Sequence, residues 1–257
     1  MFLSLASSSR GNAAIIKNDD TTILVDCGIS GKKLTQILRD EGISCDEIDA
    51  LLITHEHSDH TIGAGIISRR FDIPVYATQK THEKMDIGLM RDENIKIIDK
   101  ECDFEIRSIG IRPFSISHDA ADPVGYSLFC GKSKYSIATD TGIMTDTLFD
   151  AISGSDFIML EANHDIDMLM YGEYPYHLKK RIMSKLGHLS NDIAAQTAVR
   201  LLNCNTKHIM LGHLSEKNNE PHIAYKTVEN ALIGCGARIG EDIGLCVANR
   251  YEVTRFV

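Results

Sequence analysis

The sequence predicts an α/β protein with substantial antiparallel pairing, folded as a single domain over residues 1–257. Short runs of β-branched and apolar residues alternate with longer segments of helical periodicity, which is typical of α/β chains. Near the start and the middle of the chain, strand-like runs follow each other directly, and such consecutive strands favour antiparallel pairing. No low-complexity segment or Pro/Ser-rich linker divides the chain, so no domain boundary is expected.

The expected strands and helices follow from composition and period. Nine runs have the composition of strands: Thr22–Val25, Leu51–Thr54, Val75–Thr78, Ile109–Ser117, Val124–Cys130, Tyr135–Thr139, Phe157–Leu160, His208–Leu211 and Gly244–Val247. Seven segments have helical spacing: Lys33–Glu41, Ile62–Phe71, Thr81–Met90, Thr145–Ile152, Tyr176–Leu186, Asn191–Asn203 and Pro221–Ile233. The last helix begins with a proline, which a first helical turn tolerates.

Composition and charge exclude several classes of protein. The 257 residues are 43% hydrophobic and 25% charged, with a formal net charge of −9. No apolar stretch approaches the ~20 residues of a membrane-spanning helix. The N-terminus lacks the basic region of a secretory signal. Seven scattered cysteines without a Cys-x-x-Cys pair indicate reduced thiols in a cytoplasmic protein, and no membrane interaction is expected.

The strongest chemical signal is a cluster of histidines in the segment Thr54–His60, which reads THEHSDH. In an extended chain, residues two apart point the same way, so His55 and His57 can face one metal ion. As the chain turns toward the next helix, Asp59 and His60 can face a second ion. Imidazole with carboxylate ligands suits Zn²⁺, Mn²⁺ or Fe better than Ca²⁺ or Mg²⁺. The alternative is an exposed polar turn.

Three further candidate ligands each follow an apolar strand-like run: His118, Asp140 and His213. A metal site needs ligands that converge from separate elements, and the ends of strands supply them. Each residue alone could be an ordinary surface or core residue. Together with the histidine cluster, they provide enough ligands for two ions, with Asp140 as a bridging carboxylate.

This pattern, His-x-His-x-Asp-His followed by a His, an Asp and a final His at strand ends, resembles the metallo-β-lactamase superfamily. The resemblance spans nearly the whole chain and implies a four-layered αβ/βα sandwich. It assigns the ligands as follows: His55, His57 and His118 for the first metal, Asp59, His60 and His213 for the second, and Asp140 as the bridge. It also implies that Asp26 orients ligands, although Asp26 could equally be a turn residue at a strand end.

The superfamily holds several activities, so the fold decides little by itself. Dinuclear β-lactamases usually carry a Cys where Asp140 stands, and they are exported, which disfavours that activity. The segments Leu160–Asp165 and Gly187–Asn191 resemble the acidic and the histidine-containing loops of transfer-RNA-processing and phosphodiesterase branches. The resemblance places His188 near the scissile phosphate with Glu161 as its partner. Ser190 would cap a helix whose N–H groups favour an anion.

A basic segment lies beside these loops. Residues 174–191 carry four fixed positive charges and no acid, although the whole chain is acidic. Basic residues interleaved with aromatic rings suit a nucleic acid, so we expect DNA to bind here through Tyr174, Tyr176, Lys179, Lys180 and Arg181. The alternative is a solvated amphipathic helix.

Four segments together resemble one bacterial branch of the superfamily, the YycJ/WalJ (VicX) group, whose members look like 5′-to-3′ exonucleases acting on DNA. These segments are Ser7–Asn12, Tyr174–Leu178, Gly187–Asn191 and Leu214–Pro221. One departure concerns the early loop, which more typically reads Ser-Gly-Ser-Ser-Gly-Asn. Here Ser8 and Arg10 replace small or glycine positions, which puts the backbone contacts of that loop in doubt.

The expected activity is therefore hydrolysis of a phosphodiester with two divalent ions, Mn or Zn, with Fe as a further candidate. Asp59 would accept the proton of water, and His188, oriented by Glu161, would donate one to the leaving oxygen. Three alternatives stay open: a small-molecule phosphodiesterase, a thioester hydrolase of the glyoxalase II type, and a metal-dependent regulatory protein. The oligomeric state is left open.

Overall fold

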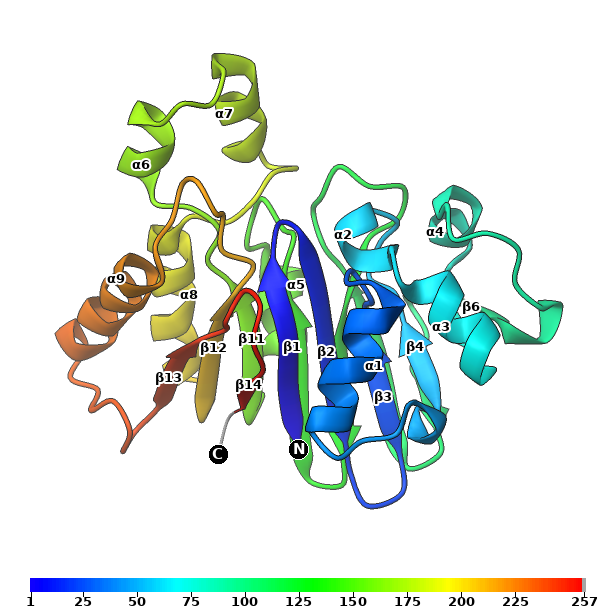
Figure 1. Ribbon diagram of the computed structural model, residues 1–257. Coiled ribbons are helices and arrows are strands. Elements are labelled where there is room, and N and C mark those ends of the chain that lie inside the picture. The colour runs from blue at the N-terminus through cyan, green and yellow to red at the C-terminus, as the bar shows by residue number, and fades with distance from the viewer. Residues whose placement is uncertain (256–257) are drawn as a thin grey trace. The chain divides into compact units, whose positions relative to one another are not determined.

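The computed structural model describes residues 1–255, which form two compact units (Figure 1). Unit 1 comprises Met1–Pro113, Ala120–Val124 and residues 249–255, and unit 2 comprises Phe114–Asp119 and Gly125–Ala248. The chain thus passes from one unit to the other within a strand. The prediction that the chain is one domain stays a prediction.

Unit 1 contains a mixed sheet in the order β14-β1-β2-β3-β4-β5-β6. The pairs from β14 to β3 are antiparallel, and those from β3 to β6 are parallel. Its strands are β1 (Phe2–Ser8), β2 (Gly11–Lys17), β3 (Thr22–Val25), β4 (Ala50–Leu52), β5 (Val75–Thr78), β6 (Ile95–Ile98) and β14 (Thr254–Arg255). β7 (Phe104–Ile106) pairs antiparallel with the start of β8 (Ile109–Ser115).

The helices of unit 1 pack on this sheet because their apolar residues repeat at helical spacing. Leu34 and Leu38 lie one turn apart in α1 and are fully buried with Leu24 and Leu51 of the sheet. Ile67 joins the same core. The helices are α1 (Gly31–Asp40), α2 (Ser58–Thr61), α3 (Ala64–Phe71) and α4 (Gln79–Lys84), with short 3₁₀ turns at Cys45–Glu47 and Asp92–Asn94.

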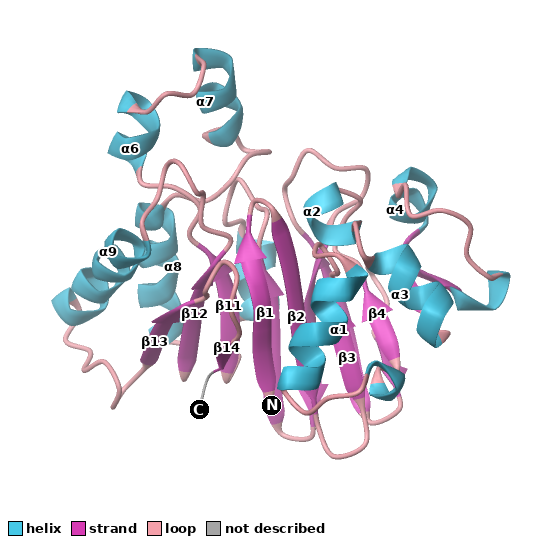
Figure 2. Ribbon diagram, in the orientation of Figure 1, coloured by secondary structure: helices cyan, strands magenta, loops and turns pink. Residues whose placement is uncertain are grey.

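Unit 2 contains the strands β9 to β13, of which β9 and β10 pair antiparallel and β10 to β13 pair in parallel. They are β9 (Val124–Cys130), β10 (Ser133–Ala138), β11 (Phe157–Glu161), β12 (His208–Gly212) and β13 (Gly244–Val247). The helices are α5 (Asp146–Ile152), α6 (Ile166–Tyr171), α7 (Tyr176–Ile182), α8 (Asn191–Leu202) and α9 (Pro221–Gly234), of which Figure 2 labels the last four. Small residues such as Ala194 and Ala198 let α8 approach the buried strand residues Ile209 and Leu211.

The predicted α/β class and the mixed pairing are confirmed, and the nine predicted strands are present with shifts of at most two residues at their ends. Three helices differ. The predicted Ile62–Phe71 helix begins two residues later, at Ala64 after Gly63, and the short helix α2 that precedes it was not predicted. The Thr81–Met90 helix ends at Lys84, and Gly88 adopts a left-handed conformation beyond it. The Tyr176–Leu186 helix ends at Ile182.

Composition concealed the other elements. β1 and β2 are fully or nearly fully buried, but their many Ser and Ala residues weaken the alternation that marks a strand. β6, β7, β14 and α6 have six residues or fewer, too short for a periodic signal. Within residues 1–255, no helix has the length and hydropathy needed to span a bilayer, and all seven cysteines are unpaired.

Candidate metal centre

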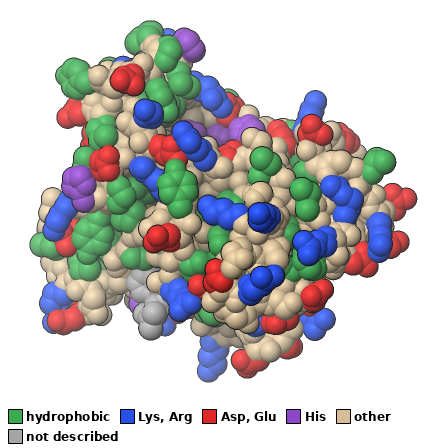
Figure 3. Space-filling model, in the orientation of Figure 1, with side chains coloured by type: hydrophobic (Ala, Val, Ile, Leu, Met, Phe, Trp, Pro, Cys, Tyr) green, Lys and Arg blue, Asp and Glu red, His purple; other side chains and the backbone are tan. Residues whose placement is uncertain are grey.

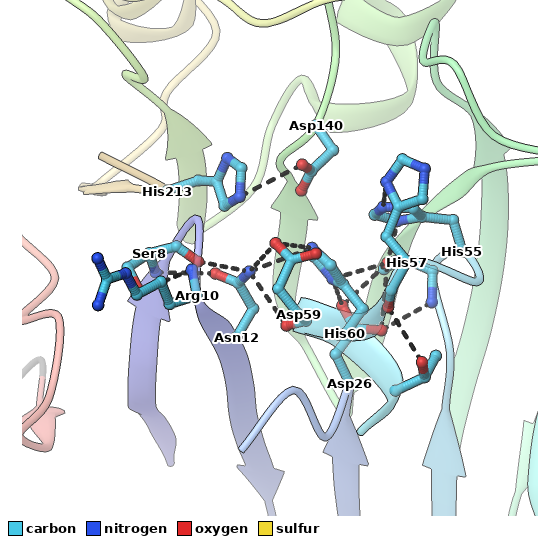
Figure 4. A network of polar contacts seen from close by, with 12 residues as sticks. Ser8, Arg10, Asn12, Asp26, His55, His57, Asp59, His60, Asp140 and His213 are labelled. Carbon is cyan, nitrogen blue, oxygen red and sulfur yellow. Dashed lines mark hydrogen bonds and ion pairs between the residues drawn. The ribbon is translucent and has the colours of Figure 1, made fainter. Parts of the chain in front are cut away.

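In unit 1, the histidine cluster begins where β4 ends, beside the end of its parallel neighbour β3 (Figure 4). Asp26 follows β3 and is 3% exposed. Its Oδ1 accepts a hydrogen bond from the backbone N–H of Thr54 at 2.8 Å, and its Oδ2 lies 2.8 Å from Nδ1 of His60. The carboxylate therefore fixes both the start of the histidine segment and the orientation of one imidazole ring.

The imidazole rings of unit 1 lie close enough together to share a cation. Nδ1 of His55 lies 3.0 Å from Oγ1 of Thr54, so Nε2 is the nitrogen that His55 can offer to a metal. That Nε2 lies 3.0 Å from Nδ1 of His57. Two nitrogens bound to one tetrahedral ion at ~2.1 Å lie roughly 3.4 Å apart, close to this spacing. The donor chemistry and the spacing thus fit a metal.

Close backbone packing holds Asp59 and His60 in place. The backbone N–H of Cys27 donates to the carbonyl of His60 at 2.8 Å. A Cβ atom at Gly28 would lie only 1.5 Å from the carbonyl oxygen of Asp59, so only glycine fits there. Nδ2 of Asn12 reaches the same corner, 3.1 Å from Nε2 of His60 and 3.5 Å from Oδ2 of Asp59.

In unit 2, polar residues follow three neighbouring strands. Asp140 lies just beyond β10, Glu161 ends β11, and His213 follows β12. Nε2 of His213 lies 3.3 Å from Oδ1 of Asp140, as the dashed line in Figure 4 marks. Asp140 and His213 have positive φ angles of 58° and 56°, as does Asp26 at 57°. Non-glycine residues seldom adopt this conformation, and those that do cluster at functional sites.

Glu161 is a fully buried carboxylate with four donors around it. Oε1 lies 2.8 Å from Nδ1 of His188 and 3.0 Å from Nδ1 of His213. Oε2 accepts hydrogen bonds from the backbone N–H groups of Thr141 at 2.9 Å and Leu189 at 3.2 Å. Burial alone would raise the pKa of Glu161, but His188 and His213 beside it bring that pKa well below its usual range. Glu161 is therefore an anion at neutral pH.

His118 also lies in unit 2, beyond the end of β8. Its Nδ1 lies 3.3 Å from the carbonyl oxygen of Gly187, and its Nε2 lies 3.9 Å from Oδ1 of Asp140. Burial lowers the pKa of His118, which keeps the imidazole neutral, the form that binds metals. His118 thus has the tautomer and the charge of a metal ligand.

Distance alone does not separate ligands from other groups in unit 2. Asp140, Glu161, His188 and His213 each offer an atom, and these four atoms lie within 4.8 Å of one another. The hydrogen bonds make the distinction, because both oxygens of Glu161 already accept two donors each. Glu161 is suited to orienting His188 and His213 rather than to binding an ion. The histidine and aspartate clusters of the two units indicate divalent metal binding.

Sequence reasoning missed several buried asparagines. Asn191 and Asn219 are fully buried and exchange two hydrogen bonds between their side-chain amides, of 3.0 and 2.8 Å. Nδ2 of Asn219 also donates to the carbonyl of Ala162 at 2.9 Å, and Nδ2 of Asn163 donates to that of His213 at 2.9 Å. These bonds tie together the loops after β11, before α8 and after β12. Their sequence signal is that they lie within the segments 160–165, 187–191 and 214–221, which carry the family resemblance.

The N-terminus of α8 differs from the expected phosphate pocket. Ser190 caps the helix as predicted, because its hydroxyl accepts from the N–H of Ile193 at 3.3 Å. However, the N–H of Asn191 donates to the carbonyl of His164 at 2.9 Å. These two N–H groups are occupied within the chain and are not offered to an anion.

Two of the three adjacent basic residues in α7 donate hydrogen bonds within unit 2, and the third lies over an aromatic ring. Nζ of Lys179 donates to the carbonyls of Met170 at 2.8 Å and Gly172 at 2.7 Å. Nε of Arg181 donates to Asp119 at 2.6 Å. Nζ of Lys180 lies 5.7 Å from the centre of the Tyr176 ring.

Comparisons with known proteins agree with this geometry. A family model described as "Beta-lactamase superfamily domain" matches residues 21–213. Exodeoxyribonuclease WalJ of Streptococcus pneumoniae is 37% identical over 242 residues, covering 93% of this chain and 90% of WalJ. Exodeoxyribonuclease YycJ of Bacillus anthracis is 36% identical, covering 93% and 92%.

Among solved structures, the metallo-β-lactamase fold protein YhfI of Bacillus subtilis matches with a TM-score of 0.74 and 15% identity, covering 99% of both chains. This likeness speaks for the fold alone. It confirms the predicted metallo-β-lactamase fold class.

Proposed function

We propose that this chain, which belongs to the β-lactamase superfamily and within it to the group of the exodeoxyribonucleases WalJ and YycJ, is a metal-dependent 5′-to-3′ DNA exonuclease. The observation that carries the proposal is identity of 36–37% with these nucleases over 93% of the chain. The Glu161–His188 pair supports it, because a proton donor held by a buried carboxylate suits a reaction that expels an alkoxide.

We propose that two divalent ions, Mn or Zn with Fe as a further candidate, bind the seven predicted ligands. His55, His57 and His118 would hold one ion, Asp59, His60 and His213 the other, and Asp140 both. Support comes from the anchored Nδ1 atoms of His55, His60, His118 and His213, which leave Nε2 as the donor of each ring. Bound ions of this kind activate water and stabilise charge that develops on a phosphate.

The side chains of the site divide the proton transfers between them. Asp59, whose side chain is 23% exposed, would accept the proton of the attacking water. His188 would give a proton to the leaving oxygen. Glu161, whose Oε1 lies 2.8 Å from Nδ1 of His188, would orient the ring so that its other nitrogen can give the proton.

The substrate would contact the segment 174–181, through Tyr174, Tyr176, Lys179, Lys180 and Arg181. Lys179 donates to backbone carbonyls and Arg181 donates to Asp119, and these bonds shape the segment. The positive charge of the segment would attract a phosphate backbone. We also infer a cytoplasmic location, which the seven unpaired cysteines support.

The proposal is tested with purified protein, Mn²⁺ and 5′-phosphorylated DNA, with RNA, a small phosphodiester and a thioester as comparison substrates. We expect digestion of DNA that stops when the metal is chelated. A protein that cleaves only the thioester or only the small phosphodiester would refute the proposal.

The role of His188 is tested by His188→Ala, with the exposed His222→Ala as the matched control. Loss of a positioned general acid should lower kcat for DNA by ~10²- to 10⁴-fold without loss of metal. A p-nitrophenolate leaving group, which needs no proton, should restore much of the rate. Loss of metal together with activity would instead make His188 a ligand or a structural residue.

A further inference from the structure

The chain between Glu161 and His188 makes an excursion that begins and ends at these two residues. Residues 166–186, here called the arm, contain α6 and α7. Its base is closed by the bond between Glu161 and His188 at 2.8 Å and by a backbone bond from Asn163 to Leu189 at 2.9 Å. The arm is therefore anchored at the candidate proton donor.

The surface of the arm is unusually apolar. Fourteen large hydrophobic side chains are exposed in the described chain, and six of them belong to these few residues. The tyrosines stand out, because Tyr171 is 88% and Tyr176 is 71% exposed. Figure 3 shows hydrophobic and basic side chains next to each other on this part of the surface. The six are Ile166, Met170, Tyr171, Tyr176, Met183 and Leu186.

The charge of the arm is opposite to that of the chain. The arm has four basic and two acidic residues, a net charge of +2, whereas the chain has −9. Lys180 lies 5.7 Å from the centre of the Tyr176 ring, so a cation and an exposed aromatic ring form one small surface. A partner that fits must offer negative charge together with flat apolar groups.

Single-stranded nucleic acid has both properties. We propose that unpaired bases stack on Tyr171 and Tyr176 while the phosphates lie near the basic residues of the arm, so that the enzyme acts on unpaired ends. This inference rests on the proposed function and narrows its substrate. A blunt duplex hides its bases and would gain little from the tyrosines. A second copy of the chain would bring two surfaces of like charge together.

The first test measures binding without catalysis. Fluorescence anisotropy in a chelator gives the Kd of an oligothymidylate of about 16 nucleotides and of a blunt duplex of equal length. The Y171A/Y176A variant loses two base-stacking contacts. If each contributes stacking energy at the low end of the measured range, the Kd for the single strand should rise roughly 25-fold. Tyr251→Ala, which removes an exposed tyrosine of unit 1, should change nothing.

The second test reports stacking itself. The chain has no tryptophan, so Y176W carries a single indole. Its emission should be quenched by the oligothymidylate and far less by the duplex, whereas Y251W should respond to neither.

Three results would overturn the proposal. The first is a Kd for the single strand that changes less than about threefold in Y171A/Y176A. The second is equal quenching of Y176W emission by single strand and duplex. The third is a dimer of the unaltered protein that dissociates in the tyrosine variants while their DNA affinity is unchanged. Digestion of DNA by the unaltered protein is measured in parallel. If the unaltered protein digests DNA while these results hold, only the role of the arm is wrong.

Discussion

Replacing Glu161 by Gln changes one carboxylate oxygen to an NH₂ group. The groups around this carboxylate are hydrogen-bond donors, so an NH₂ group has no suitable partner there. Each carboxylate oxygen faces two groups, the Nδ1 atoms of His188 and His213 on one side and two backbone N–H groups on the other. The backbone groups can only donate, so the Gln carbonyl must face them. Its NH₂ group then meets the two Nδ1 atoms.

That arrangement reverses the tautomer of His213. Its Nδ1 must accept a hydrogen bond, so the proton moves to Nε2, the nitrogen that would bind a metal. Loss of such an orienting carboxylate typically weakens metal binding by about 10- to 100-fold, or ~1.4 to 2.8 kcal/mol. We expect Glu161→Gln to lower metal affinity by this amount.

The assay is a competition titration in which a chelator of known affinity and the protein share Mn²⁺ or Zn²⁺. Glu241→Gln is the matched control, because Glu241 is an exposed residue of unit 2 that pairs with Arg238 on the surface. Circular dichroism shows whether the variant is folded. Metal affinity of a folded Glu161→Gln protein equal to that of the unaltered protein would refute the account of His213.

Three further predictions concern stability. Burial lowers the pKa of His164 to about 4, so the unfolded chain binds more protons between pH 4 and 6.5. Urea unfolding of the metal-free protein should therefore lose up to ~3 kcal/mol across that range as the pH falls, and His164→Gln should lose less. Gly28→Ala would press a methyl group against the Asp59 carbonyl, and thermal unfolding should report a loss of about 3 kcal/mol; an unchanged midpoint contradicts the close packing. Asn219→Ala should cost about 3 kcal/mol, and a double-mutant cycle with Asn191→Ala should be non-additive; additive losses would mean that the two amides act independently.

The ends of strands could be predicted from sequence because the signal, an apolar run followed by a polar residue, lies within a few consecutive residues. An apolar run followed by Asp or His places a polar group at the edge of a sheet, and Asp26, Asp140 and His213 all lie there. Their left-handed backbone conformation was not predictable, because it is imposed by neighbouring elements and not by residue type.

Contacts between distant segments could not be predicted. Arg181 belongs to a basic run that suggests a phosphate contact, but it donates to Asp119, which is 62 residues away in sequence. Asn191 and Asn219 resemble ordinary turn residues and are nevertheless fully buried partners. β1 could not be predicted because its small residues weaken the alternating pattern of a strand, and its burial depends on its pairing with β2.

The proposed activity is the removal of nucleotides from the 5′ end of DNA in a metal-dependent reaction. The most direct measurement is a time course with a single-stranded DNA labelled at its 5′ end, in Mn²⁺ and in chelator. We expect the label to appear from the first time points as a mononucleotide, and only with metal. A ladder of progressively shorter 5′-labelled strands, or equal digestion in chelator, would contradict it.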